Sequence, residues 1–141
     1  MKESPRRRTR ELVLQALYAS DCSDTAPEQT FASVFKGEKL SERNLEFSRK
    51  LFTLVREHSA WADEQIGRLA EHWDVNRIAA IDRVILRMAL VELEHMPDTP
   101  LKVVLNEAIE LARKFSTSES PAFVNGILDA YVKETEKVKE E

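Results

Sequence analysis

Five cationic side chains fall within the first ten residues of this 141-residue chain, and their type suits them to bind an anion. They are Lys2, Arg6, Arg7, Arg8 and Arg10. With one acid among them, the segment has a net charge of +4, whereas the remaining residues carry −8 and the whole chain −4. A guanidinium group donates forked hydrogen bonds that match phosphate oxygens, and it can also stack on bases. The segment therefore predicts a nucleic-acid contact, with RNA as the ligand.

Ser4-Pro5 predicts that a helix begins within this basic segment, because serine caps helices and proline suits their first turn. Cations at a helix N-terminus oppose the helix dipole, and each costs roughly a few tenths of a kcal/mol. Selection for stability alone would place acids there. The arginines thus indicate an anion site at the free backbone N–H groups of the first turn. A solvated basic arm without a ligand is the alternative interpretation.

Arg7, Leu14 and Tyr18 are spaced so that they lie along one side of this helix. An arginine and an aromatic ring on one side could hold a phosphate and a base. For Tyr18, packing or contact with a protein partner is the more common role, and both interpretations stay open here.

The chain carries no recognisable pattern for catalysis. Its histidines, His58, His72 and His95, match no compact metal-ligand spacing, and the single Cys22 has no cysteine partner for zinc. The sequence also lacks a glycine-rich phosphate loop and the serine motifs of nucleophilic enzymes. We therefore expect no enzyme activity, no metal and no cofactor.

The composition is typical of one all-α domain over residues 1–141. Hydrophobic residues make up 43% of the chain and charged residues 33%, and only three glycines and five prolines are available for turns. No apolar run reaches the length of a membrane span, and no signal peptide follows the basic N-terminus. With one cysteine, no internal disulfide can form. We expect a cytoplasmic protein without a membrane-bound segment.

Start and stop signals divide the chain into about seven helices. Helix starts are predicted at Ser4-Pro5, Ser41, Thr99-Pro100 and Ser120-Pro121, and Gly37 predicts the end of a short helix. A further break is expected near Ser59. Residues 78–96 are apolar on nearly every face, which predicts a central helix. Residues 1–10 would form a basic arm, and residues 133–141 a frayed tail.

Two positions in the predicted helices need a specific explanation. Asp82 is an acid in the otherwise apolar central segment, so it is expected at an exposed edge or as a first-turn acid favoured by the helix dipole. Asn125-Gly126 interrupts the last helix with a residue that weakens helices by roughly 1 kcal/mol. We favour close helix packing as the reason for Gly126; the alternative is a ligand approaching beside Phe123.

Four ordered segments of the chain resemble the NusB family of transcription antitermination factors. They are RRRTRELVLQALY at residues 6–18, IDRVILRMALVEL at 81–93, NEAIELARKF at 106–115 and FVNGILD at 123–129. The resemblance implies two small helical bundles packed together in one domain. It also implies binding to the boxA element of nascent ribosomal RNA together with NusE, which is ribosomal protein S10. That pair joins the antitermination complex on RNA polymerase with other Nus factors.

The resemblance also assigns residues to two surfaces. The arginine segment, with Glu119 and Phe123 at the start of the last helix, would lie at the RNA. Tyr18 and Asp82 would face NusE. We leave open whether the protein is a monomer or a homodimer.

Three other interpretations stay open from the sequence. One is a helical protein-interaction module whose arginines bind no specific RNA. Another is the NusB-like domain of an rRNA cytosine methyltransferase, although the sequence ends without a methyltransferase domain. The last is an enzyme with an unrecognised site. Titration with RNA at two salt concentrations would test the first, and an activity assay the last.

Overall fold

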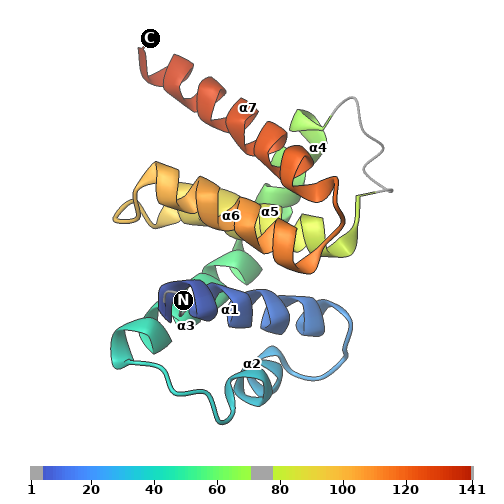
Figure 1. Ribbon diagram of the computed structural model, residues 1–141, viewed down its shortest axis with the longest axis vertical. Coiled ribbons are helices and arrows are strands. Elements are labelled where there is room, and N and C mark those ends of the chain that lie inside the picture. Colours follow the sequence, from blue (N-terminus) through green and yellow to red (C-terminus); the bar gives the residue numbers. More distant parts are fainter. Residues whose placement is uncertain (1–4, 71–77, 141) are drawn as a thin grey trace. The chain divides into compact units, whose positions relative to one another are not determined.

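A computed structural model describes residues 5–70 and 78–140 of the chain. Within these residues it contains seven α-helices and no strand (Figure 1). The helices are α1 Pro5–Asp21, α2 Pro27–Phe35, α3 Glu42–Glu57, α4 Ser59–Leu69, α5 Ala80–His95, α6 Leu101–Phe115 and α7 Ser120–Glu140. The prediction of an all-α fold with about seven helices is confirmed.

The chain divides into two compact units, residues 1–57 and 58–141. In the first unit, α1 packs against both α2 and α3. The apolar residues of α1 follow the helical period, so one stripe is buried, including Leu12, Val13 and Leu17. On α3 the matching stripe includes Leu51 and Val55, both at most 2% exposed. These stripes form the core that holds the arginine-bearing end of α1.

In the second unit, α5 is the central helix and packs against α4, α6 and α7. Its side chains Ile85, Leu86 and Leu90 are fully buried, as its apolar sequence predicts. A two-pronged ion pair also joins α5 to α4: Arg87 donates from Nε to Asp63 at 2.7 Å and from Nη2 at 2.8 Å. The central position of α5 gives the other helices of this unit a common packing surface.

Some of the predicted helix boundaries are confirmed and others are wrong. Ser41 caps α3, since its hydroxyl accepts a hydrogen bond from the backbone N–H of Asn44 at 3.1 Å. The break near Ser59 is also confirmed, because α3 ends at Glu57 and α4 begins at Ser59. Thr99 does not cap α6, because Pro100 itself occupies the N-cap position.

At the start of the last helix, the predicted Ser120 cap is wrong, because Ser120 is the first residue of α7. The first predicted cap, Ser4, lies outside the described residues. At its other end α7 continues to Glu140, well beyond Val132, where the sequence suggested that packing would end. A frayed tail over residues 133–141 stays a prediction.

The glycines at positions 37 and 126 have opposite environments. Gly37 follows α2 with a φ of +81°, a conformation that side-chain-bearing residues rarely adopt, so its role at the helix end is confirmed. Gly126 lies on α7, and apart from its chain neighbours and the nearby backbone of its own helix, no heavy atom of the described residues lies within 4 Å of the position where a Cβ would stand. The explanation by close helix packing is therefore wrong, and Gly126 is an exposed glycine inside a helix.

Cys22 directly follows α1, and it is exposed and unpaired. Among the described residues, none of the helices combines the length and the hydropathy that crossing a membrane requires.

Candidate nucleic-acid interface

The four arginines of the basic segment belong to the first two turns of α1, which begins at Pro5. Residues 5–10 are therefore helical, and the basic arm over residues 1–10 stays a prediction. Arg6, Arg7 and Arg8 are half-buried, whereas Arg10 is only 3% exposed. The remaining cation of this segment, Lys2, lies outside the described residues.

Arg6 and Arg10 share one aromatic ring on α3. The guanidinium carbon of Arg6 lies 4.1 Å from the centre of the Phe47 ring, and that of Arg10 lies 5.0 Å from it. Arg6 also donates from Nε to the side-chain oxygen of Asn44 at 2.7 Å. A cation over an aromatic face is attracted by the ring's quadrupole. These two arginines therefore help to fix α1 on α3.

Burial changes the role that Arg10 can play. Arg10 as a whole residue is only 3% exposed, so it offers little surface to a phosphate in solution. An RNA contact at Arg10 would require this side chain to move, and it stays a prediction. Arg6 keeps partial exposure, and stacking on Phe47 leaves the edge of its guanidinium as a hydrogen-bond donor.

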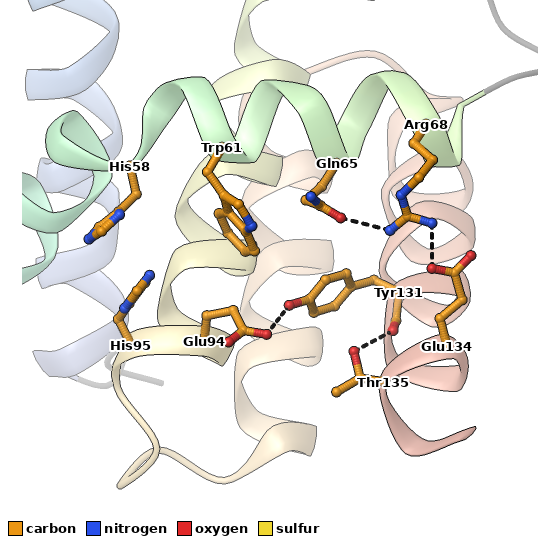
Figure 2. Close-up of a pocket in the computed structure, with 9 residues that line it drawn as sticks. All are labelled: His58, Trp61, Gln65, Arg68, Glu94, His95, Tyr131, Glu134 and Thr135. Carbon is orange, nitrogen blue, oxygen red and sulfur yellow. Dashed lines mark hydrogen bonds and ion pairs between the residues drawn. The ribbon is translucent and has the colours of Figure 1, made fainter. Parts of the chain in front are cut away.

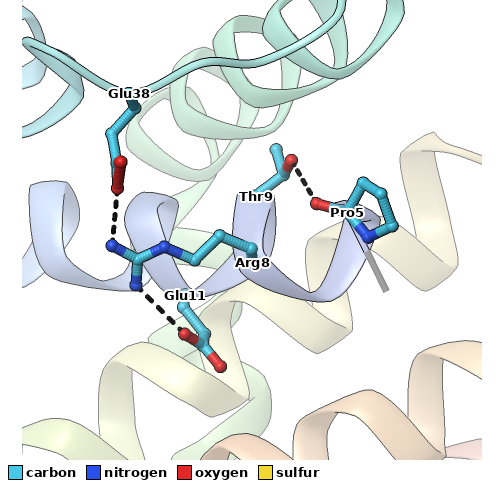
Figure 3. A network of polar contacts seen from close by, with 5 residues as sticks. All are labelled: Pro5, Arg8, Thr9, Glu11 and Glu38. Carbon is cyan, nitrogen blue, oxygen red and sulfur yellow. Dashed lines mark hydrogen bonds and ion pairs between the residues drawn. The ribbon is translucent and has the colours of Figure 1, made fainter. Parts of the chain in front are cut away.

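Arg8 lies between two carboxylates, as Figure 3 shows. Its Nη1 donates to Glu11 at 3.2 Å and its Nη2 to Glu38 at 2.5 Å. The hydrogen bond to Glu38 is the main reason why the pKa of Arg8 is raised above its already high ordinary value. Arg8 remains 42% exposed, so the pair lies at the surface.

Asp82 is buried, at 6% exposure, so its predicted position at an exposed edge is wrong. Its two carboxylate oxygens accept hydrogen bonds from the hydroxyls of Ser116, at 2.6 Å, and Ser120, at 2.8 Å. Ser120 also accepts a hydrogen bond from the backbone N–H of Thr117, at 3.2 Å. Asp82 thus ties the start of α5 to the connection between α6 and α7.

The candidate residues beside this connection are accessible to different degrees. Glu119 is exposed, and Phe123, one helical turn later on α7, is half-buried. Both lie next to Ser120, whose hydroxyl bonds to Asp82, so this carboxylate fixes the part of the chain that carries them. The structure brings Asp82, Glu119 and Phe123 into one local region of the second unit.

Tyr18 is 38% exposed, which is high for a large aromatic side chain near the end of a packed helix. Leu14, one turn earlier, is 1% exposed. Arg7, Leu14 and Tyr18 therefore do not form one exposed face of α1, because Leu14 belongs to the core. Tyr18 stands as a separate exposed ring near the other end of α1.

A pocket of about 450 Å³ lies in the second unit, lined by residues of α4, α5 and α7 and by His58 (Figure 2). At one end the rings of His58 and His95 are stacked 4.0 Å apart. At the other end Arg68 donates to Glu134 at 2.5 Å. The histidine stack could not be predicted from local sequence, because the two residues lie 37 positions apart.

The polar groups of this pocket bind one another. Tyr131 donates its hydroxyl to Glu94, and burial together with this bond raises the pKa of Tyr131. No group of three or more potential metal ligands occurs in the part of the chain that the structure describes. His72 lies outside that part. The paired side chains Arg68, Glu134, Tyr131 and Glu94 join α4, α5 and α7, and the pocket is not our candidate site.

Comparison with known proteins gives a direct match to one family. The model of the NusB family matches residues 7–133. The chain is 41% identical over 136 residues to a transcription antitermination protein NusB of Symbiobacterium thermophilum, covering 91% of this chain and 89% of that protein. The chain belongs to the NusB family. Its function is that of a transcription antitermination factor, and this family is not enzymatic.

Solved structures of NusB proteins share the fold. A structure of NusB from T. maritima has a TM-score of 0.84 and 36% identity, over 94% of both chains. A structure of the antitermination factors NusB and NusE in complex with dsRNA has a TM-score of 0.80, over 92% of this chain and 96% of that chain. Its identity is 23%, so this second likeness concerns the fold.

Sequence reasoning missed several residues that shape the arginine surface of this NusB protein. Glu11 is three positions after Arg8, a helical spacing that predicts an ion pair. Glu38, Asn44 and Phe47 lie 30 or more positions after their arginines, and no local pattern connects them. The arginine motif is thus a packing element of the first unit as well as a candidate ligand site.

Proposed function

We propose that this NusB-family factor binds the boxA element of nascent ribosomal RNA together with NusE, ribosomal protein S10. In this function it joins the antitermination complex on RNA polymerase with other Nus factors, in the cytoplasm. The main support is the cluster of three half-buried arginines, Arg6, Arg7 and Arg8, at the N-terminus of α1. Guanidinium groups at the N-terminus of a helix suit phosphate oxygens, because their planar forked donors match the phosphate and the helix dipole favours an anion there. Further support is the solved complex of related factors with NusE and dsRNA.

We propose an RNA contact on each of the two units. One is the arginine cluster, extended by Lys2 on the basis of sequence. The other is the start of α7 with Glu119 and Phe123, where Phe123 could stack on an unpaired base. An exposed acid such as Glu119 would contact the base or ribose rather than phosphate, since carboxylates only accept hydrogen bonds when ionised.

The proposed NusE surface includes Tyr18. Exposed tyrosines are enriched among residues that dominate protein interfaces, because they combine a large apolar ring with a polar hydroxyl. A body with a net charge of −8 outside the first ten residues also suits a basic ribosomal protein. For Asp82 we propose an indirect role, because its carboxylate already holds Ser116 and Ser120.

One observation favours a different function, a protein-interaction module without specific RNA binding. Arg6, Arg7, Arg8 and Arg10 all have partners within this chain, which a purely structural motif would also show. Arg7→Ala is the most informative variant, because loss of Arg6 or Arg10 would also remove a contact with Phe47.

Gel shifts with boxA RNA and a scrambled RNA, each with and without NusE, test the proposal. We expect preferential boxA binding that NusE strengthens, since two ligands that bind cooperatively must do so reciprocally. Arg7→Ala should weaken RNA binding and preserve NusE binding, and Tyr18→Ala should do the reverse. Arg49→Ala, which removes an exposed arginine of α3, is the matched control. Equal binding of the two RNAs in the presence of NusE would contradict the proposal.

A further inference from the structure

The contact between Arg8 and Glu38 places a carboxylate where a phosphate is expected to bind. Glu38 Oε1 lies 2.5 Å from Arg8 Nη2, and the two side chains are 28% and 42% exposed. Figure 3 shows that Glu38 reaches Arg8 from the chain segment that follows α2. A carboxylate and a phosphate present the same kind of oxygen acceptor to a guanidinium group. Glu38 therefore accepts a hydrogen bond from Arg8 Nη2 that an RNA phosphate would otherwise accept.

The two acids at Arg8 differ in how firmly they are held. The Glu11 side chain is 2% exposed and belongs to the same helix as Arg8. Glu38 lies in the connection between α2 and α3, next to Gly37, and its backbone N–H donates to Phe35 at 3.1 Å. Only the side chain of Glu38 must rotate to release Arg8. Glu11 stays in place while Glu38 can exchange.

The surroundings leave space for this exchange. Glu38 lines a groove of about 1110 Å³ between α2 and α3, together with Phe31, Lys36 and Arg49. A released carboxylate can turn into this groove, which Lys36 also lines. The side chain of Glu38 is already partly hydrated, so its release does not uncover a buried charge.

We propose that Glu38 is an internal competitor of RNA phosphate at Arg8 and thereby sets the affinity of the arginine surface for RNA. This inference rests on the RNA-binding function proposed above. On binding, one anion replaces another: the Glu38 carboxylate leaves Nη2, and a phosphate oxygen accepts its hydrogen bond. Because a phosphate contact carries no base information, the competition affects all RNA sequences alike. Glu38 thus lowers the affinity for every RNA by about the same factor.

The test is Glu38→Gln in the full-length protein, with dissociation constants measured for boxA and scrambled RNA oligonucleotides at low salt. Partly exposed ion pairs are weak, so we expect affinity to rise by about two- to fivefold, equally for both RNAs. In an Arg8→Ala background most of this gain should disappear. Glu38→Asp, which keeps the charge but shortens the reach to Arg8, should give a smaller gain than Glu38→Gln.

Glu134→Gln is the matched control, because Arg68 and Glu134 form an ion pair of the same 2.5 Å length. It should leave RNA affinity unchanged. If the wild-type protein binds boxA but Glu38→Gln binds it equally or more weakly, Glu38 only holds Arg8 in position and the inference is wrong. If the wild-type protein with NusE does not bind boxA, the proposed function fails as well. A gain that persists fully without Arg8 would also overturn the inference.

Discussion

At the residue scale, one arginine motif contains side chains with different surroundings. Arg10 is enclosed against Phe47, whereas Arg8 lies at the surface between two acids. Arg6 combines both situations, since it stacks on Phe47 and remains half-buried. The charge of a residue alone does not decide whether it binds a ligand, because a buried cation is stabilised by its own protein.

We expect Arg10→Ala to lower the free energy of unfolding by about 1–2 kcal/mol, the range for a cation–π contact that is removed from water. The measurement is urea unfolding followed by circular dichroism. Arg49→Ala, on the exposed side of α3, should leave the stability nearly unchanged. Equal stabilities of the two variants would show that the Phe47 contact contributes nothing.

The burial of Arg10 and Asp82 could not be predicted from local sequence, for a physical reason. Helical spacing shows which side of a helix is apolar, but a polar residue can be buried if distant groups satisfy it. The serines that satisfy Asp82 lie 34 and 38 positions away. Phe47 is equally remote from Arg10 in the sequence. The exposure of Tyr18, a single aromatic at the end of a stripe, could be anticipated.

At the element scale, the signals that depend on neighbouring residues predicted the helices well. Ser41 accepts a hydrogen bond from a backbone N–H three residues later, and Gly37 adopts a positive φ at a helix end. Both signals depend only on residues close in the sequence. The prediction failed at Ser120, where the hydroxyl bonds to Asp82 on another helix. A tertiary contact there replaced the local cap. Helix number and order were thus predictable, whereas the connection between α6 and α7 was not.

The two contrasting glycines provide a prediction about helix stability. Gly126→Ala should raise the free energy of unfolding by about 0.5–1 kcal/mol, because alanine favours the helix and meets no neighbour. Gly37→Ala should lower it by about 1–2 kcal/mol, since a Cβ opposes the left-handed backbone conformation. Thermal unfolding of both variants measures the two changes.

The outcome for Gly126 also bears on the RNA surface. If Gly126→Ala stabilises the protein but weakens RNA binding, a ligand approaches this part of α7 closely, beside Phe123. If it destabilises the protein, α7 has a packing partner that the described structure lacks, and our account of this glycine is wrong.

At the scale of the whole molecule, charge is distributed unevenly along the chain. The first ten residues carry a net charge of +4. The other residues carry −8, because they include 24 acidic and 16 basic side chains. RNA binding must therefore depend on a small positive region of a negatively charged protein. Electrostatic attraction at such a region weakens as salt screens it. The slope of log K against log salt concentration therefore gives the number of phosphates that this region contacts.

We expect the arginines to contribute a slope of about −2 to the dependence of log K on log salt, from about −0.7 for each of three phosphate contacts. Because Arg10 is buried, a fourth contact is not expected. Affinity should fall about 20-fold between 50 and 200 mM salt from this contribution. Fluorescence titrations at several salt concentrations measure the slope, and Arg7→Ala should reduce its magnitude by about 0.7. An unchanged slope in that variant would place the phosphates elsewhere.

The exposed thiol of Cys22 has a consequence for experiments on this protein in solution. Since the chain has no second cysteine, any disulfide at this position must join two molecules. The backbone N–H of Cys22 donates to the carbonyl of Tyr18, so the two residues lie one helical turn apart along the chain. Oxidation in air would therefore cross-link two copies beside the surface proposed for NusE and block it. A maleimide dye on Cys22 would instead report docking at that surface through a change in its fluorescence.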